Sequence, residues 1–347
     1  MYRVLIVKTS SLGDIIQSFV VLNDLKRRFP TCEIDWAVEA PFAPIVAAHP
    51  MVSRVISLEI KQRKHWLRGY RLLRSQKYDV VFDLQANCKS GIITWLSRGA
   101  MKVGYGFQSV REWPNIFATH VRFNISKQQN IRLFYLELIE RYFDRSLARD
   151  MEGVSLHIDR SEKSKIEQIL APLRPGPKLM VCPGSKWSNK QLKESTWIEF
   201  LQKIHTFCGA NFLLMWGDER EKALCAHLAH HVPNAFVIDK LPLPTWQNLM
   251  NAVDLVMAVD SGALHLSATT HTPSFSLFGP TSPQIFKPLG SHHVAIQGAC
   301  PYGRVFEKQC PVLRSCPTGA CIKELKAAEL FQAFQSQCAF LRPGSPL

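Results

Sequence analysis

The chain has no long hydrophobic run. No apolar stretch among its 347 residues approaches the ~18–20 residues that a membrane-spanning helix needs. We also expect no secretory signal peptide, because Met1, Tyr2 and Arg3 lead directly into a predicted strand. These two absences predict a cytoplasmic protein. The hydrophobic fraction of 46% is ordinary for a globular chain, and the length suggests about two domains.

Several well-known catalytic motifs are absent from the sequence. The dinucleotide fingerprint G-x-G-x-x-G does not occur, which disfavours a dinucleotide-dependent redox enzyme. The zinc-protease pattern H-E-x-x-H and the nucleophile elbow of hydrolases are also missing. The spacing of a Walker A loop is not found either, so a P-loop nucleotidase is disfavoured.

Acidic residues are scarce. The chain has 28 Asp and Glu against 42 Lys and Arg, a net charge of +14, which implies an acidic partner. Residues 60–78 contain no Asp or Glu. Their cations are Lys61, Arg63, Lys64, Arg68, Arg71, Arg74 and Lys77, with Trp66, Leu67, Tyr70 and Leu73 interleaved at roughly helical spacing. This segment is either a solvated helix face or a binding surface, and both interpretations stay open.

The ten cysteines do not show the paired C-x₂-C spacing of common zinc sites. Five are scattered, mostly beside apolar residues, which predicts small thiols in the core: Cys32, Cys88, Cys182, Cys208 and Cys225. The other five crowd the C-terminal end: Cys300, Cys310, Cys316, Cys321 and Cys338. We expect neither a bound metal nor a cofactor.

Strand and helix patterns alternate along the chain, which predicts two α/β domains with parallel sheets. In the first domain, strands are predicted at 3–8, 33–38, 52–58, 79–84 and 101–104, and helices near 14–28, 42–48, 64–76, 89–98 and 130–143. In the second, strands are predicted at 179–182, 212–215, 235–238, 255–259 and 274–278, and helices at 195–208, 219–231, 245–252 and 262–270. The predicted bounds are 1–160, a helix and Pro-rich linker over 161–178, a second domain over 179–322, and a C-terminal helix and tail over 323–347. We expect two Rossmann-like domains facing each other across a cleft, with the last helix returning to the first domain.

The first strand is followed at once by a polar turn and a helix. Residues 4–7 are apolar and rich in β-branched side chains, and Leu12, Ile15 and Ile16 begin a helical pattern. Asp14 therefore lies where a helix begins, at the carboxyl end of a strand, where open α/β sheets bind ligands. It is either a general base or a cap for its helix.

Two strand ends of the second domain carry phosphate- and ribose-binding residue types. Residues 182–190 combine Gly184 and Ser185 with Lys186 and Lys190, which suits a phosphate-binding turn but also an ordinary loop. Residues 215–221 end on Glu221, a carboxylate that could accept hydrogen bonds from a ribose or cap the next helix.

A third cluster gives the strongest signal. Asp260 ends an apolar strand, and Ser261 and Gly262 open a helix whose first turn offers free N–H groups to a diphosphate. His265 follows one turn later, a position where a lone histidine is more often structural. The turn that ends on Thr281 closes the next strand and could reach the same place. Three such clusters in one domain favour a nucleotide-diphosphate site.

These residues resemble a known family, glycosyltransferase family 9, the lipopolysaccharide heptosyltransferases. Residues 4–14, 83–85 with 89–90, 111–112 and 127–129 are most similar to the members that add the first heptose. Residues 259–262 with His265, and 278–281, match the donor-site motifs of the family. The resemblance spans nearly the whole chain.

The resemblance implies a two-domain GT-B fold and an inverting transfer that needs no metal. The donor would be ADP-L-glycero-D-manno-heptose, bound by the second domain. Asp14 would be the general base. The donor-binding candidates are Ser185, Lys186, Lys190, Glu221, Asp260, Ser261, Gly262, His265 and Thr281.

The acceptor implied by the resemblance is a Kdo residue on lipid A, bound by the first domain. Its candidate residues are Ser11, Lys61, Arg63, Lys64, Arg111 and Gln128. The basic segment 61–77 would meet the Kdo carboxylates and lipid A phosphates, and would hold the enzyme on the anionic cytoplasmic face of the inner membrane.

Three alternatives remain. The spacing of Cys300, Cys310, Cys316 and Cys321 resembles members that add the second heptose, so the acceptor could be an already heptosylated core. Another sugar transferase of the same family is also compatible. A nucleic-acid-binding protein would explain the net charge of +14 but not the three strand-end clusters, so we expect no nucleic-acid partner.

Overall fold

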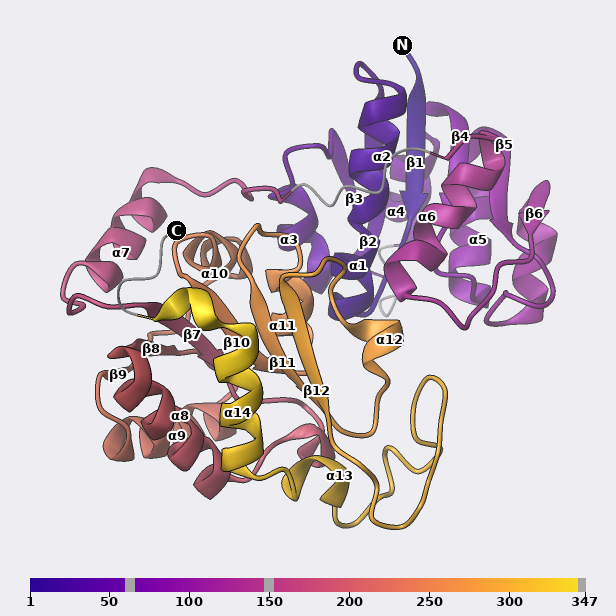
Figure 1. Cartoon of the computed structure of the whole chain (residues 1–347). Coiled ribbons are helices and arrows are strands. Elements are labelled where there is room, and N and C mark those ends of the chain that lie inside the picture. The colour runs from indigo at the N-terminus through magenta and orange to yellow at the C-terminus, as the bar shows by residue number, and fades with distance from the viewer. Residues whose placement is uncertain (60–65, 147–152, 343–347) are drawn as a thin grey trace. The chain divides into compact units, whose positions relative to one another are not determined.

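The computed structural model of the chain describes residues 1–59, 66–146 and 153–342 (Figure 1). The chain forms two compact units, Met1–His157 and Ile158–Leu347. Each unit contains one six-stranded sheet in which every pair of strands is parallel. The predicted α/β class with two Rossmann-like domains is therefore confirmed. The exact domain bounds and the cleft between the domains stay predictions.

The first unit is built from six strands and the helices between them. The strands are β1 (Arg3–Val7), β2 (Glu33–Glu39), β3 (Arg54–Leu58), β4 (Lys77–Asp83), β5 (Arg98–Tyr105) and β6 (Val121–Phe123). The helices are α1 (Leu12–Ser18), α2 (Val20–Arg28), α3 (Ala43–Ala47), α4 (Trp66–Arg74), α5 (Cys88–Leu96) and α6 (Ile131–Tyr142), with 3₁₀ helices η1 (Ala40–Phe42) and η3 (Trp113–Ala118).

The strand order of the first sheet is β3-β2-β1-β4-β5-β6. Because side chains alternate along a strand, β1 sends Leu5 and Val7 into one apolar cluster with Leu73 of α4 and Ile93 of α5. On the other face, Phe82 of β4 packs edge-on against Tyr142 of α6. Both faces of the sheet are thus covered by helices, as an all-parallel sheet requires.

The structure corrects one prediction for the first unit and adds two elements to it. The helix predicted over 14–28 is divided at Phe19, where the Ser18 hydroxyl donates 2.7 Å to the Ile15 carbonyl and competes with the helical hydrogen bonds. The edge strand β6 and the 3₁₀ helix η3 were not predicted. The helix predicted over 64–76 is present from Trp66 to Arg74, and positions 64–65 lie outside the described residues.

The second unit repeats the same plan. Its strands are β7 (Lys178–Cys182), β8 (Asn211–Leu214), β9 (Ala235–Val237), β10 (Leu255–Val259), β11 (Ser274–Phe278) and β12 (His293–Gln297). Its helices are α7 (Arg160–Leu170), α8 (Glu194–Cys208), α9 (Glu219–His231), α10 (Leu243–Met250), α11 (Gly262–Ser267), α12 (Pro283–Phe286), α13 (Ala320–Lys323) and α14 (Ala327–Gln337), with 3₁₀ helices η4 (Ser188–Lys190) and η5 (Ala339–Leu341). The strand β12 was not predicted.

The last helix contributes to the core of the second unit. Phe334 of α14 is fully buried and packs edge-on against Phe200 of α8 and Phe275 of β11. Leu330 and Cys338 join the same cluster. The C-terminal helix predicted within 323–347 runs from Ala327 to Gln337, and its apolar side is used within this unit. A return of the tail to the first domain stays a prediction.

Both sheets have the same topology. The order β12-β11-β10-β7-β8-β9 places the first strand of the second unit beside its fourth, as β1 lies beside β4 in the first unit. At such a point the loops leaving the two central strands run in opposite directions, which opens a crevice for ligands at the carboxyl ends of the strands. The candidate residues that follow β1, β4, β7 and β10 all lie at these two edges.

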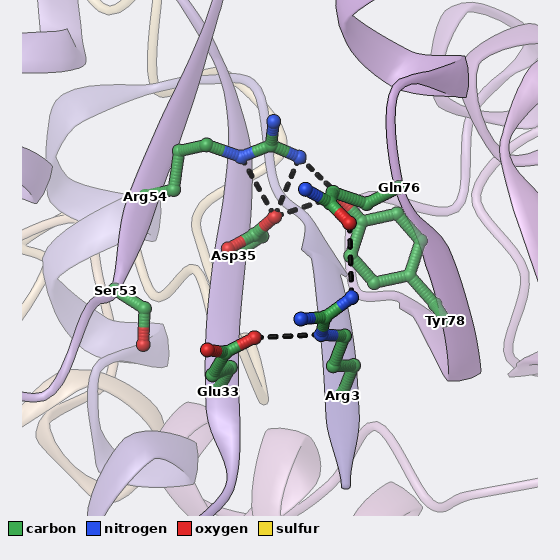
Figure 2. A pocket seen from close by; sticks show the side chains of 7 residues that line it. All are labelled: Arg3, Glu33, Asp35, Ser53, Arg54, Gln76 and Tyr78. Atoms are coloured by element: carbon green, nitrogen blue, oxygen red, sulfur yellow. Dashed lines mark hydrogen bonds and ion pairs between the residues drawn. The ribbon is translucent and has the colours of Figure 1, made fainter. Parts of the chain in front are cut away.

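The opposite, amino edge of the first sheet is closed by ion pairs. Figure 2 shows that Arg54 and Tyr78 both point at Asp35, while Arg3 pairs with Glu33 on the neighbouring strands. The Asp35 carboxylate accepts from Arg54 at 2.7 Å and from the Tyr78 hydroxyl at 2.7 Å. These groups satisfy one another, so we assign this edge a role in stability.

The two ion pairs at the amino edge differ in burial, and we expect them to differ in how much they contribute to the free energy of unfolding. Asp35 is 7% exposed, so Asp35→Asn should lower the free energy of unfolding by about 1–3 kcal/mol, because the guanidinium of Arg54 loses its negatively charged partner. The Arg3–Glu33 side chains are about 40% exposed, so Glu33→Gln should cost less than about 1 kcal/mol. Urea unfolding of both variants checks this, and equal losses would contradict it.

Candidate functional site

Asp14 lies in the first turn of α1, directly after the loop that leaves β1. Its carboxylate oxygen Oδ2 accepts from the backbone N–H of Ser11 at 3.1 Å and from the Ser11 hydroxyl at 2.9 Å. Asp14 therefore caps its own helix start, as one of the two sequence interpretations expected. This cap also fixes the direction of a half-buried carboxylate, so it is compatible with the other interpretation, a general base.

Charged and phenolic side chains surround Asp14 on this edge. Lys8 is buried, reaches the Leu84 carbonyl at 3.4 Å and lies 5.0 Å from the centre of the Tyr135 ring. Burial raises the pKa of Tyr135 well above its usual value, the negative charge of Asp14 adds to this rise, and Arg111 opposes it. Asp14 and Arg111 thus both act on one buried phenol, which puts these two predicted residues at the same edge.

A buried carboxylate organises the neighbouring loop. Asp83 ends β4 and is fully buried, and burial raises its pKa although hydrogen bonds oppose this. Its oxygens accept from the N–H groups of Gln85 and Ala86, from the Ser90 hydroxyl at 2.9 Å and from the Asn115 amide at 2.6 Å. Asp83 ties the start of α5 to η3, a role that the sequence interpretation missed.

This loop is joined to the Asp14 loop by two side chains. The side-chain amide oxygen of Gln85 accepts from the N–H of Ser10 at 3.3 Å, and the Lys8 ammonium donates to the backbone carbonyl of Leu84. The two loops at the strand-order reversal therefore form one hydrogen-bonded unit.

The described acceptor candidates lie in the first unit, on the loops near Asp14 and Asp83 and on the loop before α6. Ser11 is exposed and donates to Asp14. Arg111 is exposed, and its N–H donates to the Ala86 carbonyl at 3.1 Å, beside the Asp83 network. Gln128 is exposed in the loop before α6. Lys61, Arg63 and Lys64 lie outside the described residues.

In the second unit, four predicted residues converge. The Asp260 oxygen Oδ2 accepts from the Lys190 ammonium at 2.6 Å and from the Thr281 hydroxyl at 2.6 Å, and His265 lies 3.7 Å from Oδ1. Burial alone would raise the pKa of Asp260, but Lys190, His265 and Thr281 together hold it below its usual range. Asp260 is therefore a buried anion that positions the cation of Lys190.

The loop after β7 separates the two lysine candidates. Lys190 is held by Asp260 in η4, whereas Lys186 is exposed. Ser185 is buried, and its carbonyl accepts from the Gln191 amide at 2.6 Å, which fixes the turn. The geometry thus favours Lys190 over Lys186 as the preorganised cation of this loop.

Glu221 bridges two strand-end loops. Its carboxylate accepts from the Gly217 N–H at 2.7 Å, and a Cβ added at Gly184 would lie 2.2 Å from its carboxyl carbon. Position 184 therefore needs glycine for Glu221 to approach the loop after β7. Burial raises the pKa of Glu221. The helix cap of α9 is instead Asp218, which accepts from the N–H groups of Arg220 and Glu221.

The loop between β10 and α11 carries Ser261 and Gly262 next to Asp260. The Ser261 hydroxyl oxygen is buried and has no hydrogen-bond partner among the described residues. An unpaired buried hydroxyl is costly unless something binds it. It is the polar atom of this edge that most directly indicates a bound ligand.

The structure tests the cysteine predictions. Cys32, Cys182, Cys208 and Cys225 are buried, as predicted, whereas Cys88 is exposed because it starts α5 at the edge of the sheet. Cys300, Cys310, Cys316 and Cys321 line one cavity with Tyr302 and Arg304. Over the described ranges, no group of three His, Cys, Asp or Glu side chains has the geometry of a metal site. None of the described helices has the length and hydropathy of a membrane span.

Comparisons with known proteins agree with this geometry. The family model for glycosyltransferase family 9 (heptosyltransferase) matches residues 66–315. The lipopolysaccharide heptosyltransferase 1 of Pseudomonas aeruginosa is 32% identical over 325 residues, which cover 89% of this chain and 87% of the relative.

Solved structures show the same fold. The E. coli heptosyltransferase WaaC with ADP-2-deoxy-2-fluoro heptose matches with a TM-score of 0.74 and 25% identity, over 96% of this chain and 99% of that chain. A family 9 glycosyl transferase from Veillonella parvula matches with a TM-score of 0.81 at 15% identity, over 97% of both chains. The predicted GT-B class is thereby confirmed. With the family model matching most of its length, the chain belongs to glycosyltransferase family 9, the heptosyltransferase family.

Proposed function

We propose that this family 9 enzyme transfers L-glycero-D-manno-heptose from ADP-heptose to a Kdo residue of lipid A-Kdo, with inversion and without a metal. The observation that carries the proposal is the pair of strand-order reversals with opposite chemistry. The first unit places a half-buried carboxylate, Asp14, at its edge, and the second places the cation of Lys190 at the equivalent edge.

An inverting transfer needs a base on the acceptor side. In the proposed step, Asp14 takes the proton from the acceptor hydroxyl while the hydroxyl oxygen forms a bond to the anomeric carbon. Ser11 holds Oδ2 of Asp14 through two hydrogen bonds, which fixes the direction of the carboxylate that receives the proton. Arg111 supplies a positive charge on the same side for an anionic acceptor.

The same transfer needs stabilisation of the departing diphosphate. As the bond between the anomeric carbon and the diphosphate oxygen breaks, negative charge grows on ADP. Lys190 faces this charge from a position fixed by Asp260, and the buried Ser261 hydroxyl and the N–H of Gly262 add hydrogen-bond donors. Glu221 accepts from the ribose hydroxyls, and Ser185, His265 and Thr281 shape the pocket.

Removing the base should stop transfer and leave the donor site intact. We expect Asp14→Asn to lower kcat by about 10²–10⁴-fold with nearly unchanged ADP affinity, because the amide keeps the shape but cannot take the proton. Product detection by mass spectrometry and ADP titration calorimetry measure the two effects.

A matched control separates catalysis from helix capping. Glu162 holds in α7 the position that Asp14 holds in α1, with its carboxylate accepting from the N–H of the N-cap residue, Asp159, at 3.0 Å. Glu162→Gln should lose only the stability of a cap, about 1 kcal/mol, and keep full turnover. Near-normal turnover in Asp14→Asn would refute the general-base role.

The two lysines of the donor loop should behave differently. We expect Lys190→Ala to weaken ADP binding about 10- to 100-fold, because a charge-assisted contact is lost. Lys186→Ala should weaken it by less than about threefold, since this exposed side chain is not preorganised. Calorimetry of ADP binding, well below the unfolding temperature, measures both, and the reverse ranking would contradict the assignment.

The acceptor is the part of the proposal with a second candidate. The spacing of Cys300, Cys310, Cys316 and Cys321, which line one cavity, resembles enzymes that act on an already heptosylated core. Kdo₂-lipid A and its mono-heptosylated form, each offered with ADP-heptose, distinguish the two. We expect Kdo₂-lipid A to gain the mass of one heptose. If only the mono-heptosylated form reacts, the enzyme has the second-heptose activity. Reaction with UDP-sugars instead would assign another family 9 transfer.

The proposal includes peripheral association with the anionic cytoplasmic face of the inner membrane, where a lipid A acceptor would lie. The support is the run of cations over residues 61–77, of which Arg71, Arg74 and Lys77 are described and exposed.

A further inference from the structure

Four large apolar side chains are exposed on two neighbouring elements of the first unit. Ile92 and Trp95 of α5 are 55% and 66% exposed, and Trp113 and Phe117 of η3 are 58% and 74% exposed. We call these four residues the aromatic surface. Clusters of this kind on a soluble chain mark an interaction site more often than chance exposure.

The two elements that carry this surface lie side by side. A Cβ added at Gly91 of α5 would lie 3.2 Å from the Asn115 amide nitrogen and 3.7 Å from the Ala118 Cβ, both in η3. Trp113 and Phe117 stack edge-on with ring centres 5.9 Å apart. The inward side chains of both elements are already buried, so the core does not need the exposed rings.

The aromatic surface is bordered by positive charge. Residues 60–127 hold thirteen Lys and Arg but only three Asp and Glu. Of these acids, Asp83 is buried, Asp79 accepts from the N–H of Arg3, and exposed Glu112 accepts from the N–H of Cys88 at 2.8 Å. Arg74 of α4 reaches the end of α5, where its guanidinium donates to the Leu96 carbonyl at 3.3 Å, and exposed Arg98 donates back to the Arg74 carbonyl.

We propose that α5 and η3 form the face by which the first unit docks into the interface of an anionic lipid bilayer. The aromatic rings insert at the level of the headgroups, and the bordering cations meet the lipid phosphates. Exposed Trp and Phe beside Arg and Lys is the composition of an interfacial anchor. The surface of an ordinary protein partner carries charges of both signs, and it would not complement this excess of positive charge.

The position of the aromatic surface fits the proposed function, on which this inference rests for its biological purpose. Helix α5 starts five residues after β4 ends, at the edge of the sheet that carries Asp14, and η3 is tied to that edge by the bond of Asn115 to Asp83. An acceptor whose acyl chains stay in the bilayer would therefore present its sugar beside the proposed base.

Flotation of the full-length protein with vesicles tests the docking face. We expect binding to vesicles of phosphatidylglycerol and phosphatidylethanolamine, weaker binding at high salt, and little binding to phosphatidylcholine alone. The double variant Trp95→Ser/Phe117→Ser should lower the partition to the anionic vesicles by at least about tenfold. The matched control Tyr302→Ser/Val305→Ser removes side chains that are 61% and 94% exposed in the second unit, and should bind as the wild type does.

Two acceptors separate this inference from the proposed function. With a soluble Kdo-bearing acceptor that lacks acyl chains, the double variant should turn over normally, whereas KM for an acceptor embedded in vesicles should rise about tenfold with kcat unchanged. If the double variant binds vesicles as well as the wild type does, α5 and η3 are not the docking face, whichever sugar the enzyme transfers. Sedimentation analysis showing a dimer that the double variant dissociates would also overturn it, in favour of a contact between two copies.

Discussion

The burial of two all-parallel sheets on both faces is the constraint on which the rest of the molecule depends. The strand β10 is apolar throughout and β1 is apolar after Arg3, because helices cover each sheet on both faces. Polar chemistry is therefore confined to the strand ends. Since both sheets place their first strand beside their fourth, each unit has one edge where diverging loops leave room for a ligand.

The two edges share this geometry but differ in charge. In the first unit, a half-buried carboxylate lies at the surface of the edge, fixed by the Ser11 hydroxyl and N–H. In the second unit the carboxylate of Asp260 is instead buried, and the more exposed charge at the edge is the Lys190 ammonium that it holds. In the proposed inverting transfer, the first edge would accept the proton and the second would stabilise the leaving anion.

The sequence predicted the features that depend on local patterns. The buried central strands, the helix start at Asp14 and the strand-end turns that carry Lys190 and Asp260 all follow from periodicity and from turns at strand ends. The weak edge strands β6 and β12 were missed, because they carry only short and partly exposed apolar patterns. The Asp83 network was missed because its partners, Ser90 and Asn115, lie seven and 32 residues away in the chain. Only the folded sheet brings such partners together.

The hydrogen bonds of Asp83 have a mechanical consequence. They lock the start of α5, the helix η3 and the loop containing Gln85 into one body, and Gln85 extends it to the loop before Asp14. A docked first unit would thus hold its base at a constant height above the lipid plane. The enzyme would then select the acceptor hydroxyl by its distance from the bilayer as well as by its chemistry.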